Sequence, residues 1–208
     1  MIKRFNIEYI RDLLIVSLFG PVLIFFFLVT AVFVVIFIGR PLFFRQIRIG
    51  LNGESFRILK FRSMSNAVDG EGELLSDEKR LGWAGKFIRR LRLDELPSFI
   101  HVYSGRISLV GPRPLPLENI IGHPLGGRRM MGKPGFTGLA QISGNTVLNS
   151  DEKFAIDVYY LEHRTVWMDL RIMIGTLVTV IFGERRNQSI VDTALVAAAT
   201  GQAKEPGQ

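Results

Sequence analysis

The longest uncharged stretch of this 208-residue chain covers residues 13–38 and reads LLIVSLFGPVLIFFFLVTAVFVVIFI. About 18 consecutive apolar residues already predict insertion into a membrane, and this mostly apolar stretch has 26 residues without a charge. It is also longer than the apolar core of a cleaved signal peptide, roughly 7–15 residues, and it lacks a clear cleavage site of small residues. We therefore interpret it as a retained membrane anchor.

Gly20 and Pro21 interrupt the first third of this anchor. Proline has no N–H to donate and its ring crowds the carbonyl four residues earlier, so a kink is expected here. A straight helix of this length would measure roughly 39 Å against a hydrocarbon core of about 30 Å, a difference that tilt can absorb. The residues alone leave two topologies open, a kinked transmembrane helix and a hairpin that leaves on the side it entered.

The charges after the anchor predict where the rest of the chain lies. Residues 39–62 carry six basic side chains and a single acidic one, and the positive-inside rule places such a flank in the cytoplasm. The flank before the anchor has a weaker basic excess, which also points inward. Two positive flanks are expected of a re-entrant hairpin.

The net charge of +7 suits three kinds of partner: nucleic acid, an anionic membrane face or a phosphorylated substrate. The basic residues do not form one block, which disfavours nucleic acid. The chain has no cysteine, so disulfides and thiolate metal sites are excluded.

Two β-prone runs in residues 43–64 flank Asn52-Gly53 and predict a β-hairpin. Lys60 and Arg62 alternate with Phe61 near the end of the second strand, so we expect their side chains on one face. A polar loop follows over residues 65–80, and then an amphipathic helix with Trp83, Phe87 and Leu91 in one stripe.

A helix is predicted after Asp94, with Asp94 as its N-cap and Pro97 in the first turn. Its expected buried side chains are Leu96, Phe99, Ile100 and Tyr103, and Gly105 ends it. Further on, the sequence predicts a short strand at 107–110, a turn-rich stretch at 133–145 and a helix at 152–162. Residues 166–183 are apolar but contain two charges, which favours an interfacial helix, and residues 187–208 are expected to be loosely ordered.

Asp94 and Glu95 form an acid pair directly after a basic run. Capping and helix-dipole interactions alone explain such a pair in an arbitrary helix. Several cations nearby would instead bind phosphates and keep the carboxylates ionised. Arg113, held between Pro112 and Pro114, is a further candidate. A carboxylate in this setting could accept a phosphoryl group covalently, with Mg²⁺ shared between carboxylate and phosphate oxygens.

Five motifs occur in this order: KFRSM at 60–64, LDELP at 93–97, SLVGPRP at 108–114, KPGFTGLAQISG at 133–144 and DVYYLE at 157–162. Together they resemble the bacterial sugar transferases, that is, the monotopic phosphoglycosyl transferases, over roughly residues 10–182. The length is similar to that of the minimal members, such as the enzyme that starts the glycan of bacterial N-linked glycosylation.

The resemblance implies an α+β fold in three parts. Residues 1–38 would hold a re-entrant membrane helix kinked at Gly20 and Pro21. Residues 39–186 would form a small catalytic domain with a β-hairpin and interfacial amphipathic helices, and residues 187–208 a flexible tail. The protein would be monotopic in the bacterial inner membrane, with this domain on the cytoplasmic face.

The resemblance also implies a reaction. A UDP-sugar binds with Mg²⁺, Asp94 attacks its β-phosphate, and UMP leaves a phosphosugar on the aspartate. Undecaprenyl phosphate then takes up this phosphosugar to give undecaprenyl-diphosphate-sugar, the first membrane step of glycoconjugate synthesis. Glu95 would act beside Asp94 as a metal ligand or handle the acceptor's proton.

The resemblance implies substrate binding at six motif positions: Lys60, Arg62, Arg89, Pro112, Arg113 and Pro114. The four basic residues among them are suited to binding phosphates. The expected partners are the UDP-sugar, undecaprenyl phosphate, membrane lipids and a second copy of the chain, but no nucleic acid. Two features depart from the family: Gly20 stands where a small polar residue commonly precedes the proline, and NTVLN at 145–149 replaces an arginine-containing turn, which leaves the sugar open. The alternative function is a non-catalytic membrane-bound adaptor that recruits an assembly partner through its basic face.

Overall fold

The computed structural model describes residues 2–202, with side chains described for residues 7–201. It mixes helices with two small β-sheets, and its contacts divide the chain into two compact units. The first unit comprises the residues up to 46 together with Arg57–Tyr103, and the second comprises Ile47–Phe56 together with the residues from 104 on. Each unit is described by itself below.

The first unit contains the apolar N-terminal helices, most of a β-hairpin and several short helices. Its elements are α1 (Ile2–Leu18), α2 (Gly20–Phe37), β1 (Phe43–Ile49), β2 (Ser55–Phe61), α3 (Asp77–Arg80), α4 (Trp83–Arg90), η2 (Leu93–Phe99) and α5 (Ile100–Tyr103). The predicted hairpin is confirmed: β1 and β2 pair, and the turn contains Asn52 in the left-handed conformation at φ 55°. The tip of the hairpin, from Ile47 to Phe56, is counted with the second unit.

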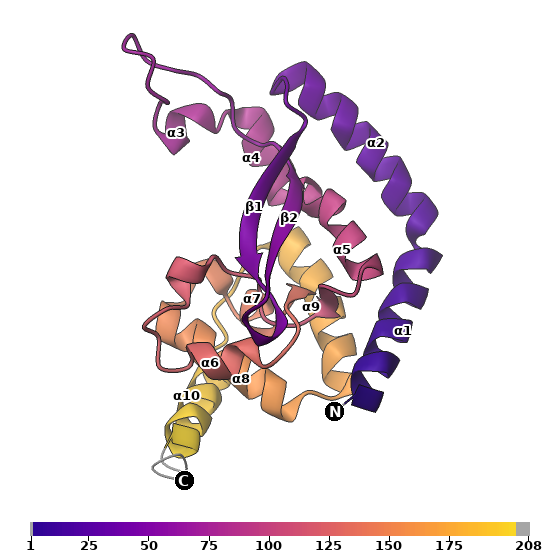
Figure 1. Ribbon diagram of the computed structural model, residues 1–208, viewed down its shortest axis with the longest axis vertical. Coiled ribbons are helices and arrows are strands. Elements are labelled where there is room, and N and C mark those ends of the chain that lie inside the picture. The colour runs from indigo at the N-terminus through magenta and orange to yellow at the C-terminus, as the bar shows by residue number, and fades with distance from the viewer. Residues whose placement is uncertain (1, 203–208) are drawn as a thin grey trace. The chain divides into compact units, whose positions relative to one another are not determined.

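The apolar run forms two helices that meet at Phe19 (Figure 1). Pro21 lies in the first turn of α2, where its missing N–H leaves the hydrogen bonds of the second helix intact. The 18 residues of α2, with a mean hydropathy of 2.8, are long and apolar enough to cross a membrane, and only 11% of this stretch is buried. The chain thus bends beside the predicted position, while the re-entrant topology stays a prediction.

The core of the first unit joins α2, β2 and α4. Val34, Phe61 and Ile88 are fully buried in one cluster, and each such side chain stabilises the fold by about 1.5–3 kcal/mol. Phe43 stacks on Phe61 with ring centroids 5.6 Å apart, and Phe27 lies 4.9 Å from the same ring. One face of the apolar helix α2 is therefore part of a protein core.

The second unit is built from short segments and three longer helices. Its elements are η1 (Leu51–Gly53), β3 (Ser108–Val110), η3 (Leu117–Asn119), α6 (Gly126–Met130), β4 (Gly135–Thr137), α7 (Leu139–Ile142), η4 (Asn145–Val147), α8 (Ser150–His163), α9 (Val166–Phe182) and α10 (Gln188–Gln202). The predicted strand, the helix near 152–162 and the apolar helix at 166–183 correspond to β3, α8 and α9.

A parallel sheet of β3 and β4 stands where the sequence predicted only turns after residue 133. Ser108 pairs with Gly135 and Val110 with Thr137. A Cβ atom at Gly135 would lie 2.0 Å from the backbone nitrogen of Gly111, so the glycine permits close contact between two backbones. The glycines of this stretch, which were predicted to lie in turns, therefore also allow the two strands to lie close together.

The prediction of a loosely ordered tail is wrong for residues 188–202, which form α10. This helix packs along α8 and buries Val191 and Ala194 completely. Its small alanine side chains permit close packing of the two helices. The same alanine-rich composition led to the prediction of weak order. Residues 203–208, which the same prediction covered, lie outside the described residues.

Candidate active site

The acid pair lies on the 3₁₀ helix η2 and not at the N-cap of an α-helix as predicted. Asp94 is the second residue of η2 and is half-buried, whereas Glu95 is buried. Arg92 takes the N-cap position with φ 55°, a left-handed conformation that non-glycine residues rarely adopt. Such conformations cluster at functional sites, where the surrounding structure holds them in place.

The predicted buried face of this helix is wrong for two of its four residues, whereas Leu96 packs against the core cluster as predicted. Ile100 is 59% and Tyr103 46% exposed, and the buried residues include Pro97, Ser98 and His101. Because η2 has three residues per turn and α5 then continues with 3.6, the face toward the core shifts relative to a single α-helix. The side chain of Ser98 donates a 2.6 Å hydrogen bond to the carbonyl of Leu59 and so ties η2 to β2.

Glu95 is held between two cations of the first unit. Lys60 Nζ lies 2.5 Å from Glu95 Oε1, and Arg92 Nη1 lies 3.9 Å from Glu95 Oε2. The Lys60 and Glu95 side chains are only 15% and 11% exposed, so water screens this pair weakly. The pair fixes the orientation of the residue directly after Asp94.

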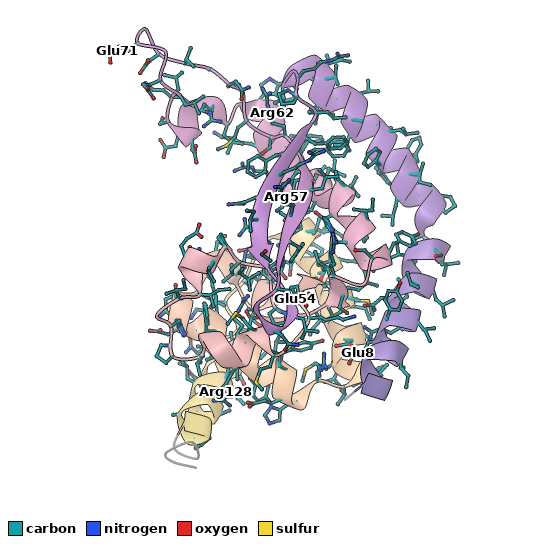
Figure 2. All side chains as sticks on the ribbon, in the orientation of Figure 1. Glu8, Glu54, Arg57, Arg62, Glu71 and Arg128 are labelled. Atoms are coloured by element: carbon teal, nitrogen blue, oxygen red, sulfur yellow. The ribbon has the colours of Figure 1, made fainter. Side chains whose placement is uncertain are left out.

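Arg62 has a structural role, because its guanidinium binds three backbone carbonyls. It donates from Nε to Met64 O at 2.7 Å, from Nη1 to Arg40 O at 2.5 Å and from Nη2 to Ile38 O at 3.3 Å. Burial, followed by the nearby Arg80, lowers the pKa of this guanidinium below its ordinary value. Arg62 lies at the end of β2 (Figure 2) and connects this strand to the exit of α2. Its predicted phosphate contact stays a prediction.

Arg89 occupies the outer side of α4 and donates from Nε to Ser63 Oγ at 2.8 Å. Gly85, one turn earlier, allows α4 to approach the same segment, because a Cβ atom there would lie 1.9 Å from Ser63 O. Helix α4 thus contacts Ser63 in two ways: Gly85 lies against its backbone carbonyl, and Arg89 binds its hydroxyl group. This contact places the exposed Arg89 on the same small unit as the acid pair.

The acid-pair helix packs directly on the apolar helix. Leu93 and Leu96, on either side of Asp94 and Glu95, contact the cluster of Val34, Phe61 and Ile88. Two leucines thereby anchor η2 to α2 while the carboxylate of Asp94 keeps partial exposure. The structure brings Lys60, Arg89, Asp94 and Glu95 into one unit with the break at Gly20 and Pro21.

The Pro112-Arg113-Pro114 segment belongs to the second unit. Both prolines are buried and Arg113 is half-buried. Gly111 N donates to Thr137 O at 2.8 Å and Gly135 N donates to Pro112 O at 2.8 Å, so the sheet holds the backbone before Arg113. Its rigidity agrees with the expectation from the two prolines.

The acid pair offers carboxylate oxygens to a divalent cation. Across residues 7–201, no three His, Asp or Glu side chains lie close enough to form a metal site. Mg²⁺ does not require such a cage, since it commonly binds one or two carboxylates together with substrate phosphates and water. Asp94 fits this pattern, whereas both oxygens of Glu95 already face cations.

Several residues that shape the site had no role assigned from the sequence. Arg92 was noticed only as one charge in a basic run, and nothing in its sequence context signals a left-handed backbone. Ser98 gave no signal at all. Asp157 lies in the DVYYLE motif, and its ion pair with Arg129 in the second unit becomes evident only in three dimensions.

Comparison with known proteins identifies the class. Residues 3–183 match the family described as bacterial sugar transferase, and the chain belongs to this family. It is 42% identical over 156 residues to the uncharacterized sugar transferase EpsL of Bacillus subtilis (strain 168), covering 73% of this chain and 76% of that protein.

Two larger relatives have named substrates. A UDP-glucose:undecaprenyl-phosphate glucose-1-phosphate transferase of Klebsiella pneumoniae is 35% identical over 82% of this chain and 38% of its own length. A UDP-N-acetylgalactosamine-undecaprenyl-phosphate N-acetylgalactosaminephosphotransferase of Aeromonas hydrophila is 32% identical over 88% of this chain and 44% of its own length. The chain thus spans less than half of these two relatives. Together with α2, the family membership points to association with a membrane.

Proposed function

We propose that this protein transfers a phosphosugar from a UDP-sugar to undecaprenyl phosphate, with release of UMP. The observation that carries the proposal is the half-buried Asp94 on a helix packed against the apolar α2, beside the Lys60–Glu95 pair. A carboxylate in this place can meet a water-soluble donor and a lipid-borne acceptor. The two larger relatives named above act on such donors and on undecaprenyl phosphate, which supports the same reaction class here.

The proposed reaction has two displacements at one phosphorus atom. An oxygen of Asp94 bonds to the β-phosphorus of the donor while the bond to the UMP oxygen breaks, so that UMP leaves with both bonding electrons. A phosphate oxygen of the acceptor then attacks the same phosphorus and releases the Asp94 carboxylate. Each step avoids a direct meeting of two anionic substrates.

Glu95 is proposed to orient this nucleophile through its contacts with Lys60 and Arg92. A residue fixed one position after Asp94 restricts the backbone of the nucleophile, and such restriction lowers the entropic part of the barrier. Arg89 and Arg113 are proposed to bind donor phosphates, where a guanidinium can make two parallel hydrogen bonds. No sugar is assigned, because one named relative uses UDP-glucose and another uses UDP-N-acetylgalactosamine.

Mg²⁺ is proposed to bind at Asp94 together with the donor's diphosphate, with Glu95 as the second candidate ligand. When bound, it would neutralise negative charge on the phosphates and so favour attack by a carboxylate. The residues of the chain supply the nucleophile and hold the site in place. Titration of membranes with EDTA, followed by Mg²⁺ or Ca²⁺, measures this requirement through UMP release.

Membranes that contain the protein, incubated with a panel of UDP-sugars and undecaprenyl phosphate, test the proposed activity. We expect UMP release with at least one donor and its loss in Asp94→Asn. The matched control is Asp77→Asn, an exposed aspartate on α3 of the same unit, which should retain activity. No turnover with any donor would favour the adaptor alternative.

We further propose that the anchor is re-entrant and that the rest of the chain lies on the cytoplasmic face. The natural lack of cysteine makes topology measurable by single-cysteine labelling. Lys3→Cys and Glu71→Cys, the latter on an exposed loop labelled in Figure 2, should both resist a membrane-impermeant reagent added from the periplasm. Labelling of Lys3→Cys alone would show that the helix spans the membrane.

A further inference from the structure

Arg129 is a buried arginine with three partners in the second unit. It lies on α6, is 5% exposed, and donates from Nε to Asp157 Oδ2 at 2.8 Å. Its Nη2 donates to the carbonyl oxygen of Arg113. Its guanidinium carbon lies 5.1 Å from the centre of the Phe154 ring. Arg129 therefore connects helix α8, which supplies Asp157 and Phe154, to the Pro112-Arg113-Pro114 segment.

A buried ion pair is a poor device for stability alone. Apolar side chains of similar volume often serve a core as well or better, because both charges lose their hydration. The carboxyl group of Asp157 shows this cost, since burial raises its pKa even though Arg129 opposes the shift. What the pair adds is direction. The planar fork of an arginine, fixed at Nε by Asp157, aims its remaining nitrogens at defined positions.

The position reached is the backbone of the half-buried Arg113. Pro112 and Pro114 restrict the φ angles on either side, and the sheet contact from Gly135 N fixes the carbonyl of Pro112. The hydrogen bond from Arg129 fixes the next carbonyl, that of Arg113 itself. The peptide units on both sides of Arg113 are thus restrained, which limits the position and direction of its Cα–Cβ bond.

We propose that Arg129, held by Asp157, is a positioning residue for Arg113, which it orients toward the diphosphate of the nucleotide-sugar donor. This inference rests on the proposed function, in which Arg113 binds donor phosphate. Arg129 does not touch the donor, because its side chain is buried against Asp157, Phe154 and the backbone. Its effect on binding passes through Arg113 alone.

A double-mutant cycle with UDP as the probe tests this coupling. UDP affinity is measured by calorimetry on the full-length protein in nanodiscs for Arg113→Ala, Arg129→Lys and the double variant. Lysine keeps the charge but cannot bridge Asp157 and the Arg113 carbonyl. We expect Arg129→Lys to weaken UDP binding about tenfold, and the double variant to bind no more weakly than Arg113→Ala.

The neighbouring Arg128 supplies the matched control. It also lies on α6 and also forms an ion pair, but its partner is Glu162, and it lies beside Gly201 of α10 (Figure 2). Arg128→Lys should bind UDP like the unaltered protein. Asp157→Asn, which retains an acceptor oxygen for Arg129, is the second variant and should weaken UDP binding less, again without adding to Arg113→Ala.

Two results would overturn the inference. Losses from Arg113→Ala and Arg129→Lys that multiply in the double variant would mean that Arg129 acts on the site independently of Arg113. Equal UDP affinity in the Arg129→Lys and Arg128→Lys variants would mean that Arg129 has no positioning role. Failure of the unaltered protein to bind UDP at all is a different result, since it rejects the proposed donor and with it the inference.

Discussion

Replacing Lys60 by methionine removes the ammonium group beside Glu95 and keeps a side chain of similar length. The Nζ–Oε1 distance is 2.5 Å and both side chains are largely buried. Loss of one partner of a fully buried pair costs about 3–5 kcal/mol. Arg92 remains 3.9 Å from Glu95 and some water reaches the pair, so we expect a cost of about 2 kcal/mol. For a chain of this size, that lowers Tm by roughly 4–8 °C.

The assay combines thermal unfolding in nanodiscs with UMP release. Lys86→Met, at an exposed position on α4, is the control and should leave both quantities unchanged. Lys60→Met should also lower kcat more than it raises KM, because Glu95 then orients the nucleophile less well. In the double variant with Glu95→Gln, the loss of stability should be smaller than the sum of the single losses. Additive losses, or a Lys60→Met protein as stable and active as Lys86→Met, would refute the orienting role of this pair.

Three further outcomes follow from individual contacts. Gly85→Ala should lower the free energy of unfolding by about 1–3 kcal/mol, measured in urea, because its Cβ atom would lie 1.9 Å from Ser63 O. Ser98→Ala should lower the free energy of unfolding by about 1 kcal/mol and reduce kcat. An unchanged kcat would show that the hydrogen bond from Ser98 to β2 does not hold the acid pair in place. The hydrogen bond from Arg186 lowers the pKa of Glu152, so its stabilisation is present above the unfolded pKa of about 4.3 and is lost as pH falls through the folded value. The Tm deficit of Arg186→Gln relative to the unaltered protein should therefore shrink below about pH 4, and a constant deficit would contradict this.

The sequence was sufficient for features that depend on local chemistry. Asn52-Gly53 predicted the hairpin because a tight turn needs left-handed residues, and Asn52 has this conformation. The helix predicted at 152–162 corresponds to α8. The break beside Pro21 follows from the missing N–H of proline. Each of these signals lies within a few neighbouring residues.

Features that depend on distant contacts were missed or predicted wrongly. The left-handed Arg92 and the 3₁₀ geometry of η2 are stabilised by packing of Leu93 and Leu96 on α2, which no local pattern encodes. The parallel pairing of β3 with β4 joins segments about 27 residues apart. The helix α10 owes its order to burial against α8 rather than to its own composition.

The candidate site was predicted in its residue types more fully than in its geometry. Asp94 and Glu95 were identified from motifs. Their different solvent exposure, half-buried for Asp94 and buried for Glu95, is a property of the folded chain. Arg62 was grouped with the phosphate-binding residues because its charge was visible in the sequence. Its hydrogen bonds to the carbonyl oxygens of Ile38, Arg40 and Met64 could not be predicted from the sequence.

Mass spectrometry of the trapped intermediate tests the central claim most directly. The protein is incubated with an accepted UDP-sugar in the absence of undecaprenyl phosphate, quenched in acid and digested. We predict a phosphosugar adduct on the peptide that contains Asp94, its disappearance on addition of the acceptor, and no adduct in Asp94→Asn. An adduct on another side chain, or steady UMP release with no adduct on the protein at any time, would contradict the account.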